Sequence, residues 1–181
     1  MVIDNFNTVT IENAMKAEIV NPTPGVYDFA AADAYVKFGQ DNNMFNVGHT
    51  LVWYIQTPDF FFKNKVNQSN TPAEKLDVMR KHIKLVAGRY AGMVHAWDVV
   101  NDLIDNDGSY RPATRVNGVG DVDTLVKAFK YAAYYAPDTE LYYNDFNAWR
   151  PEKRDVIEKM INMLKLKGSV STVWGYKRIS G

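Results

Sequence analysis

The chain has 181 residues, 46% of them hydrophobic and 13% aromatic, and 21 Lys and Arg residues balance 21 Asp and Glu residues. This length and apolar content predict one globular domain, and the zero net charge gives no reason to expect nucleic acid or an anionic membrane as a partner. We expect no membrane-spanning segment and no signal peptide, and the lack of cysteine excludes disulfides and thiolate metal sites.

Short β-type runs alternate with longer helical patterns along the chain. Four runs are predicted to be strands: residues 6–10, 45–52, 94–100 and 141–143. Four longer patterns are predicted to be helices, which begin at Ala30, at Pro72, at Asp121 or Asp123, and at Pro151. A last β-like piece covers residues 171–174. This alternation is typical of βα units and a parallel sheet.

Two of the predicted helices carry clear end signals. Thr71 and Glu74 form a capping box around Pro72, and Gly168 is placed to end the last helix. In the first helix we expect the larger apolar side chains to pack inward, namely Tyr35, Val36 and Phe38. Trp97 is expected in the core, and His82 and His95 are expected to be surface or packing residues.

Polar side chains follow each of the four predicted strands. The run ending at Val100, for example, leads directly into Asn101 and Asp102. Functional residues at several successive strand ends favour a (β/α) barrel over a doubly wound sheet, and no strand is followed by a glycine-rich phosphate loop. A closed eight-unit barrel needs about 250 residues. We therefore expect a partial barrel that lacks about three units.

The strand-end residues combine amides, carboxylates and aromatic rings. Amides and carboxylates can bind sugar hydroxyl groups, while aromatic faces stack on sugar rings, so the set indicates a carbohydrate cleft. Hydrolysis of a glycosidic bond requires two carboxyl groups, which lie about 5–5.5 Å apart in retaining enzymes. No metal or organic cofactor is expected.

Four motifs in the same order and spacing resemble glycoside hydrolase family 10. They are Phe6–Lys16, Gly48–Trp53, Trp97–Asn101 and Leu141–Asp145. The resemblance covers about residues 5 to 167 and implies a retaining endo-1,4-β-xylanase on a (β/α)8 barrel. The chain would supply strands two to five of that barrel, and residues 171–176 resemble its eighth strand. Residues 1–181 would then form a single incomplete catalytic domain.

The resemblance implies a role for each matching residue. Asp102 stands at the position of the general acid/base, and Asn101 would bind the 2-hydroxyl of the sugar that is attacked. The remaining implied substrate-binding residues are Glu12, Asn13, Lys16, His49, Trp53, Gln56, Phe146 and Trp174. Glu12 and Asp145 also have an ordinary interpretation as hydrogen-bonding residues at strand ends, and for Asp145 the two interpretations weigh equally.

The chain departs from the family pattern at places that matter for catalysis. Asp102 replaces the family's glutamate, and a displacement near 1 Å in a catalytic group can reduce the rate on the order of 10²-fold. Tyr54 stands where the family usually has histidine. The family's first unit and its sixth and seventh strands have no counterpart, and the nucleophilic glutamate belongs to the seventh. No Glu follows Glu158.

Three functions therefore remain open. The first is a xylan-degrading hydrolase that is impaired or inactive as this chain. The others are a xylan-binding protein without catalysis and a gene fragment without a function of its own. The resemblance implies xylan or a xylo-oligosaccharide as ligand and a secreted or periplasmic location. Self-association through open barrel edges is expected if the missing strands come from another chain.

Overall fold

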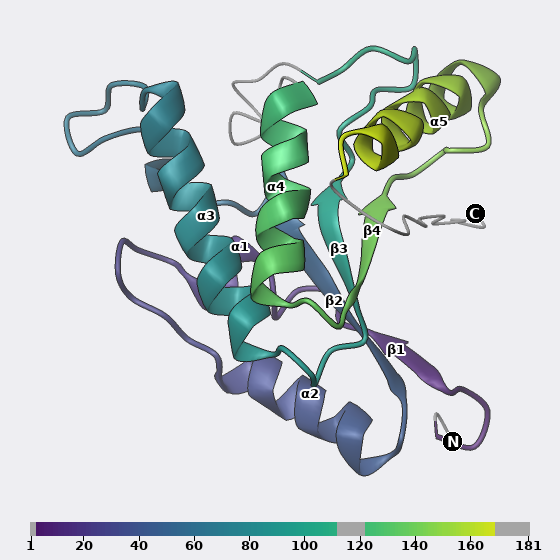
Figure 1. The fold of residues 1–181 in the computed structure, drawn as a ribbon. Helices are drawn as coiled ribbons and strands as arrows, with labels where there is room; N and C mark the ends of the chain where they lie inside the picture. Colours follow the sequence, from purple (N-terminus) through teal and green to yellow (C-terminus); the bar gives the residue numbers. More distant parts are fainter. Residues whose placement is uncertain (1–2, 112–121, 169–181) are drawn as a thin grey trace.

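The computed structural model describes residues 3–111 and 122–168 (Figure 1). Four parallel strands form one sheet in the order β1-β2-β3-β4, and each strand pairs with the next one in the chain. The strands are β1 (Thr8–Thr10), β2 (Phe45–Val52), β3 (Ala96–Asn101) and β4 (Glu140–Asn144). Within the described ranges β1 and β4 are therefore the edges of the sheet. This is the parallel sheet of a partial (β/α)8 barrel, as predicted.

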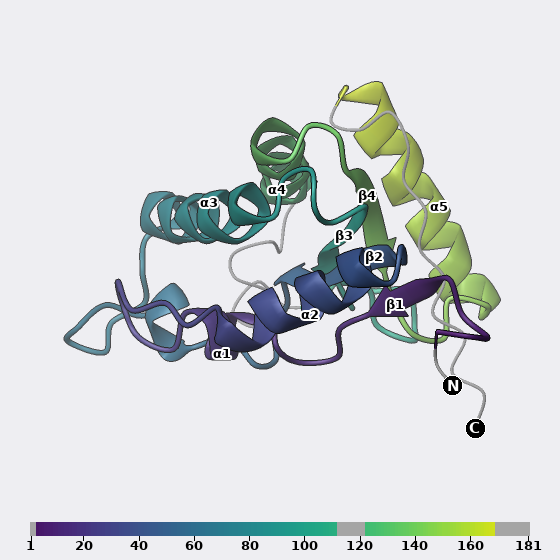
Figure 2. The same cartoon turned by 90° about the horizontal axis from the view of Figure 1, so that it is seen from below.

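Helices connect the strands and cover the sheet. They are α1 (Ala17–Val20), α2 (Ala30–Asp41), α3 (Pro72–Arg89), α4 (Val122–Tyr135) and α5 (Pro151–Leu166), with a 3-10 turn, η1 (Asp59–Phe61). Helices α3 and α4 lie side by side and pack on β2 and β3, while α5 lies beyond β4 (Figures 1 and 2). None of the helices in the described part is long and apolar enough to cross a membrane.

Most predicted elements are present near their predicted bounds. The capping box of α3 is formed in both directions, between Thr71 and Glu74, and Gly168 takes a left-handed conformation after α5. One packing prediction is wrong: Phe38 is 42% exposed, whereas Tyr35 and Val36 are buried. The β-like piece at 171–174, and Asp121 as a helix cap, lie outside the described residues.

Trp97 on β3 is fully buried, and the neighbouring strand leaves room for its ring only because position 48 is glycine. Gly48 pairs with Trp97 in the β2–β3 ladder. A Cβ atom at position 48 would lie 2.3 Å from ring carbon Cζ3 of Trp97. Since the ring is enclosed on all sides, it cannot move aside without disturbing the core.

Gly48→Ala is therefore expected to lower the free energy of unfolding by about 1–3 kcal/mol through overpacking. Urea denaturation followed by circular dichroism measures this loss. Gly88→Ala in α3 is the matched control, because a Cβ there meets its nearest atom at 3.9 Å. It should stabilise the helix by up to about 1 kcal/mol. Equal effects of the two substitutions would contradict the packing argument.

Candidate active site

The carboxyl ends of the four strands meet at one edge of the sheet, and the segments that follow them carry the candidate residues. Parallel strands bring these segments together because all of them point the same way. Three groups of contacts can be distinguished: one around Lys16, one around Asp102 and one around Asp145.

The Lys16 group joins the segment after β1 to the segment after β2. Lys16 is only 6% exposed; its Nζ donates to Asn13 Oδ1 at 2.8 Å and to Gln56 Oε1 at 2.6 Å. The ammonium also lies 4.6 Å from the ring centre of Trp53. Gln56 Nε2 donates in turn to Glu18 Oε1 at 2.7 Å, a residue that the sequence did not single out. The result is a preformed set of polar groups beside an aromatic ring. Such a set can bind the hydroxyl groups of a sugar and stack against its ring.

His49 lies deeper, at the end of β2. Its Nδ1 donates to Asp98 Oδ2 on β3 at 2.8 Å, and both side chains are only 10% exposed. The imidazole lies 6.3 Å from the ring of Trp53, centre to centre. Nε2 is the ring nitrogen that Asp98 does not engage.

Asp102 receives donors from two neighbouring strand ends. Its Oδ2 accepts from Trp53 Nε1 at 3.1 Å and from Asn101 Nδ2 at 2.8 Å. Asn101 is held in turn by Asn144, whose Nδ2 donates to Asn101 Oδ1 at 2.5 Å. Asp102 has a backbone φ of +54°, a left-handed conformation that Asp and Asn adopt more readily than other non-glycine residues. The carboxyl group is thus fixed both by its partners and by its backbone.

Arg111 holds the backbone of Asp102 from the loop after β3. Its Nε donates to the carbonyl oxygen of Asp102 at 2.8 Å, and its Nη1 pairs with Asp105 at 3.1 Å. The guanidinium lies 4.8 Å from the ring centre of Tyr54 and 5.8 Å from that of Phe146. The guanidinium that holds the backbone of Asp102 therefore lies against the rings of both Tyr54 and Phe146.

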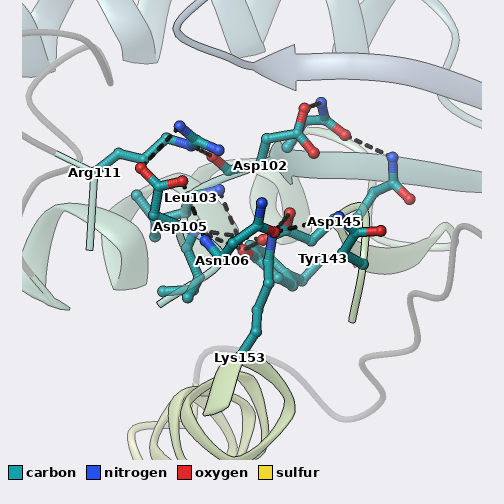
Figure 3. Close-up of polar contacts among 12 residues, drawn as sticks. Asp102, Leu103, Asp105, Asn106, Arg111, Tyr143, Asp145 and Lys153 are labelled. Atoms are coloured by element: carbon teal, nitrogen blue, oxygen red, sulfur yellow. Dashed lines mark hydrogen bonds and ion pairs between the residues drawn. The ribbon is translucent and has the colours of Figure 1, made fainter. Parts of the chain in front are cut away.

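The third group is a buried ion pair after β4. Lys153 of α5 and Asp145 are 0% and 1% exposed, and Nζ lies 2.6 Å from Oδ1 (Figure 3). Neither atom makes a hydrogen bond of regular geometry within the described part of the chain, so the attraction is that of two opposite charges. Oδ2 of Asp145 accepts from the hydroxyl of Tyr143 and from the backbone N–H of Ile104. Lys153 Nζ also lies 3.9 Å from the ring centre of Phe146.

Burial and this neighbourhood raise the pKa of the Asp102 carboxyl to about 6. Burial is the main cause; the negative charge of Asp145 and a side-chain hydrogen bond with Asp145 add to the rise. Two smaller effects, the charge of Lys153 and a hydrogen bond from the backbone amide of Phe146, lower the pKa of Asp102 and offset part of this rise. A carboxyl group with a pKa near 6 is suited to proton donation under mildly acidic conditions.

Most of the predicted site residues lie in these contact groups. Asn13, Lys16, Trp53 and Gln56 touch one another, and Trp53 also connects this group to Asp102 and Asn101. Phe146 joins them through Arg111 and Lys153. Glu12 is exposed and makes no side-chain hydrogen bond within the described residues, and Trp174 lies outside them. Among the described residues no cluster of three or more His, Asp or Glu side chains is arranged to hold a metal ion.

Comparison with known proteins identifies the family. Residues 1–175 match the family model described as Glycosyl hydrolase family 10. The chain belongs to this family. It is 43% identical over 172 residues to endo-1,4-β-xylanase A of Caldicellulosiruptor sp. (strain Rt8B.4), an alignment that covers 91% of this chain and 25% of the relative.

Solved structures agree with this assignment. An endoxylanase from a sugarcane soil metagenome superposes with a TM-score of 0.90 at 38% identity, over 96% of this chain and 50% of its own. A mutant protein solved in complex with xylotriose superposes with a TM-score of 0.87 at 32% identity, over 96% of this chain and 53% of its own. The chain thus spans a quarter of the first relative and about half of each solved structure.

Proposed function

We propose that this family 10 chain is a single incomplete catalytic domain that binds xylo-oligosaccharides at the strand ends of its half-barrel. Glu12, Asn13 and Lys16 bind the sugar on the non-reducing side of the cleavage point. His49 and Trp53 shape the subsite where the bond breaks, and Gln56 extends that side. Asn101 binds the 2-hydroxyl at the cleavage point, Phe146 stacks on the opposite side, and Trp174 is assigned to the same ligand by its motif. Asp102 takes the acid/base position.

The observation that carries this proposal is the preformed contact between the Lys16 group and Asp102 through Trp53. Trp53 offers one face to the ammonium of Lys16, and its Nε1 donates to Asp102. Residues of three strand ends are thereby held in place without a ligand, so sugar binding does not have to order them. A binding surface of this kind is compatible with hydrolysis and with binding alone.

Hydrolysis by this chain is proposed to be strongly impaired. Asp102 is one methylene shorter than the family's glutamate, and retaining hydrolysis needs a second, accessible carboxyl group. Asp145 is the carboxyl group whose charge raises the pKa of Asp102. It is buried, however, and it is bound by Lys153 and Tyr143. It cannot reach a sugar carbon while these contacts persist.

Xylotriose binding by calorimetry, combined with release of reducing sugar from xylan, tests the proposal. We expect saturable binding that Trp53→Ala weakens at least tenfold. The substitution removes a ring that can contact the sugar, and it removes the donor that holds Asp102 in place. Tyr134→Ala, which changes a 78% exposed ring on α4, is the control and should leave binding unchanged. Absence of binding by the wild-type chain would refute the proposal and favour a fragment without function.

Asp102→Asn separates residual hydrolysis from binding alone. If the wild-type chain releases reducing sugar, the substitution should lower that rate by about 10²–10⁴-fold, the usual contribution of a general acid/base. Xylotriose affinity should change little, because an amide retains acceptor capacity toward Trp53. A rate that survives Asp102→Asn would show that another group, or a contaminating enzyme, performs the hydrolysis.

Self-association through the edges of the sheet remains a prediction. Strands β1 and β4 each have one paired neighbour within the described ranges, and an unpaired parallel edge favours pairing with another chain. Sedimentation velocity across a concentration series measures this directly. A monomer at all concentrations would contradict the prediction.

A further inference from the structure

The buried cluster of Tyr143, Asp145 and Lys153 lies out of reach of any sugar, yet it holds the segment that carries Asp102. All three side chains are at most 1% exposed. The Tyr143 hydroxyl accepts from the backbone N–H groups of Leu103 and Ile104, both at 3.2 Å, and donates to Asp145.

Further backbone bonds extend this hold. Ile104 also donates to Asp145 Oδ2 at 3.3 Å, and the N–H of Asp102 donates to the carbonyl of Asn144 at 2.9 Å. Three successive backbone amides, from Asp102 to Ile104, are therefore anchored on β4 or its end (Figure 3). The ion pair between Asp145 and Lys153 would be enough to join the end of β4 to α5. The additional bonds to the residues after Asp102 connect the cluster to the candidate site.

We propose that Asp145 is a positioning residue for Asp102: through the buried Tyr143–Asp145–Lys153 cluster it fixes the backbone that follows Asp102 and sets the electrostatic surroundings of the Asp102 carboxyl group. Lys153 Nζ lies 2.6 Å from Asp145 Oδ1, and Asp145 in turn binds the backbone after Asp102, so it acts on Asp102 from a fixed position. It takes no part in forming bonds to the sugar. This inference rests on the proposed function in one respect only, namely that Asp102 serves as the general acid/base.

Other charged and titratable groups around Asp102 have weaker claims to this role. The charge of Asp102 acts on Tyr54 after β2, while Arg111, in the loop after β3, donates to the backbone carbonyl of Asp102 and pairs with Asp105. Asp105 is itself paired with Arg111 and is 45% exposed, so solvent and its partner screen its charge. Asp145 differs because it is enclosed and because Lys153 and Tyr143 hold it in place.

Titration of the Asp102 carboxyl in the ligand-free chain tests the inference without any need for catalysis. The side-chain ¹³C signal of Asp102 is assigned by its loss in Asp102→Asn and followed by NMR between pH 3 and 8. In the wild-type chain we expect a midpoint near 6, as the surroundings of the group predict. Asp145→Asn should lower this midpoint by about one pH unit or more, since it removes a like charge and leaves Lys153.

Two further variants complete the test. Lys153→Met should shift the midpoint upward, in the opposite direction to Asp145→Asn, because it removes the one cation that opposes the rise. Asp105→Asn is the matched control, with the same chemical change three residues from Asp102, and should leave the midpoint in place. A structural tie alone would reduce stability in both cluster variants without moving the midpoint in opposite directions.

The inference is overturned if the wild-type midpoint lies in the ordinary aspartate range near 4. It is equally overturned if Asp145→Asn leaves the midpoint unchanged or raises it. If Asp145→Asn and Lys153→Met do not fold, Tyr143→Phe takes their place, because it keeps both charged side chains and removes only the hydroxyl that binds the amides of Leu103 and Ile104. An unchanged midpoint in that variant overturns the inference. A failure of xylotriose binding would affect the proposed function and leave this measurement untouched.

Discussion

Lys153→Met is expected to lower the free energy of unfolding by about 3–5 kcal/mol, because it leaves a carboxylate buried without its cation. Lys153 and Asp145 are both buried, with 2.6 Å between their charged atoms. Water cannot replace the lost ammonium inside the packed end of α5. Urea denaturation at pH 7, followed by circular dichroism, measures the loss.

Two controls make this expectation specific to the ion pair. Lys159→Met changes an exposed lysine on the same helix and should alter stability by no more than about 0.5 kcal/mol. The double variant Lys153→Met, Asp145→Asn should recover much of the loss, since it neutralises both partners. If Lys153→Met costs no more than Lys159→Met, the pair does not stabilise the fold.

The second large effect is a loss of stability in acid that comes from His82. Complete burial lowers the pKa of this imidazole from 6.5 to about 4. The ring packs edge-on to Phe61 at 5.3 Å, and within the described residues neither nitrogen has a hydrogen-bond partner. Protonation therefore favours the unfolded chain, in which water solvates the charge.

The direction follows from the lowered pKa of the folded state. The contribution of neutral His82 is fully present above pH 6.5 and is lost as the pH falls from 6.5 toward 4. Over this interval the loss amounts to about 3 kcal/mol, at about 1.4 kcal/mol for each pH unit. We expect the free energy of unfolding of His82→Leu to lack this decrease between pH 6.5 and 4.

Urea denaturation of both chains at pH 7, 5.5 and 4.5 checks the His82 prediction. The difference between wild type and His82→Leu isolates the histidine, because all other titrating groups are shared. The stability advantage of the variant should grow as the pH falls. Parallel pH curves would show that His82 is protonated or solvated in the folded chain.

The fold was largely predictable because its signals are local and repeated. The capping box at Thr71 and Glu74 fixed the start of α3, and the β-type run at residues 45–52 is a strand buried on both faces. Phe38 was mispredicted for a physical reason. On α2 the inward stripe passes through Tyr35 and Val36, and a large apolar residue beside that stripe can remain in water.

The predicted site residues came from motifs, so residues that act through other side chains were missed. Glu18 binds Gln56, and Lys153 binds Asp145, across elements that are distant in sequence. One signal for Lys153 was present. It shares the buried stripe of α5 with Ile157, Met160 and Leu164, a position where a lysine needs a buried anion. Neither periodicity nor spacing could identify Asp145 as that anion.

The sequential order of the strands also bears on how the chain folds. Each strand pairs with the strand of the preceding βα unit, so no pairing waits for a distant part of the chain. During synthesis, β2 meets a finished β1, and β3 meets a finished β2. Each pairing spans one βα unit, so it is slower than hairpin formation, but the half-barrel can grow unit by unit as the ribosome delivers the chain. The sheet that presents Asp102 can thus be built before α5 and Lys153 arrive to lock its surroundings.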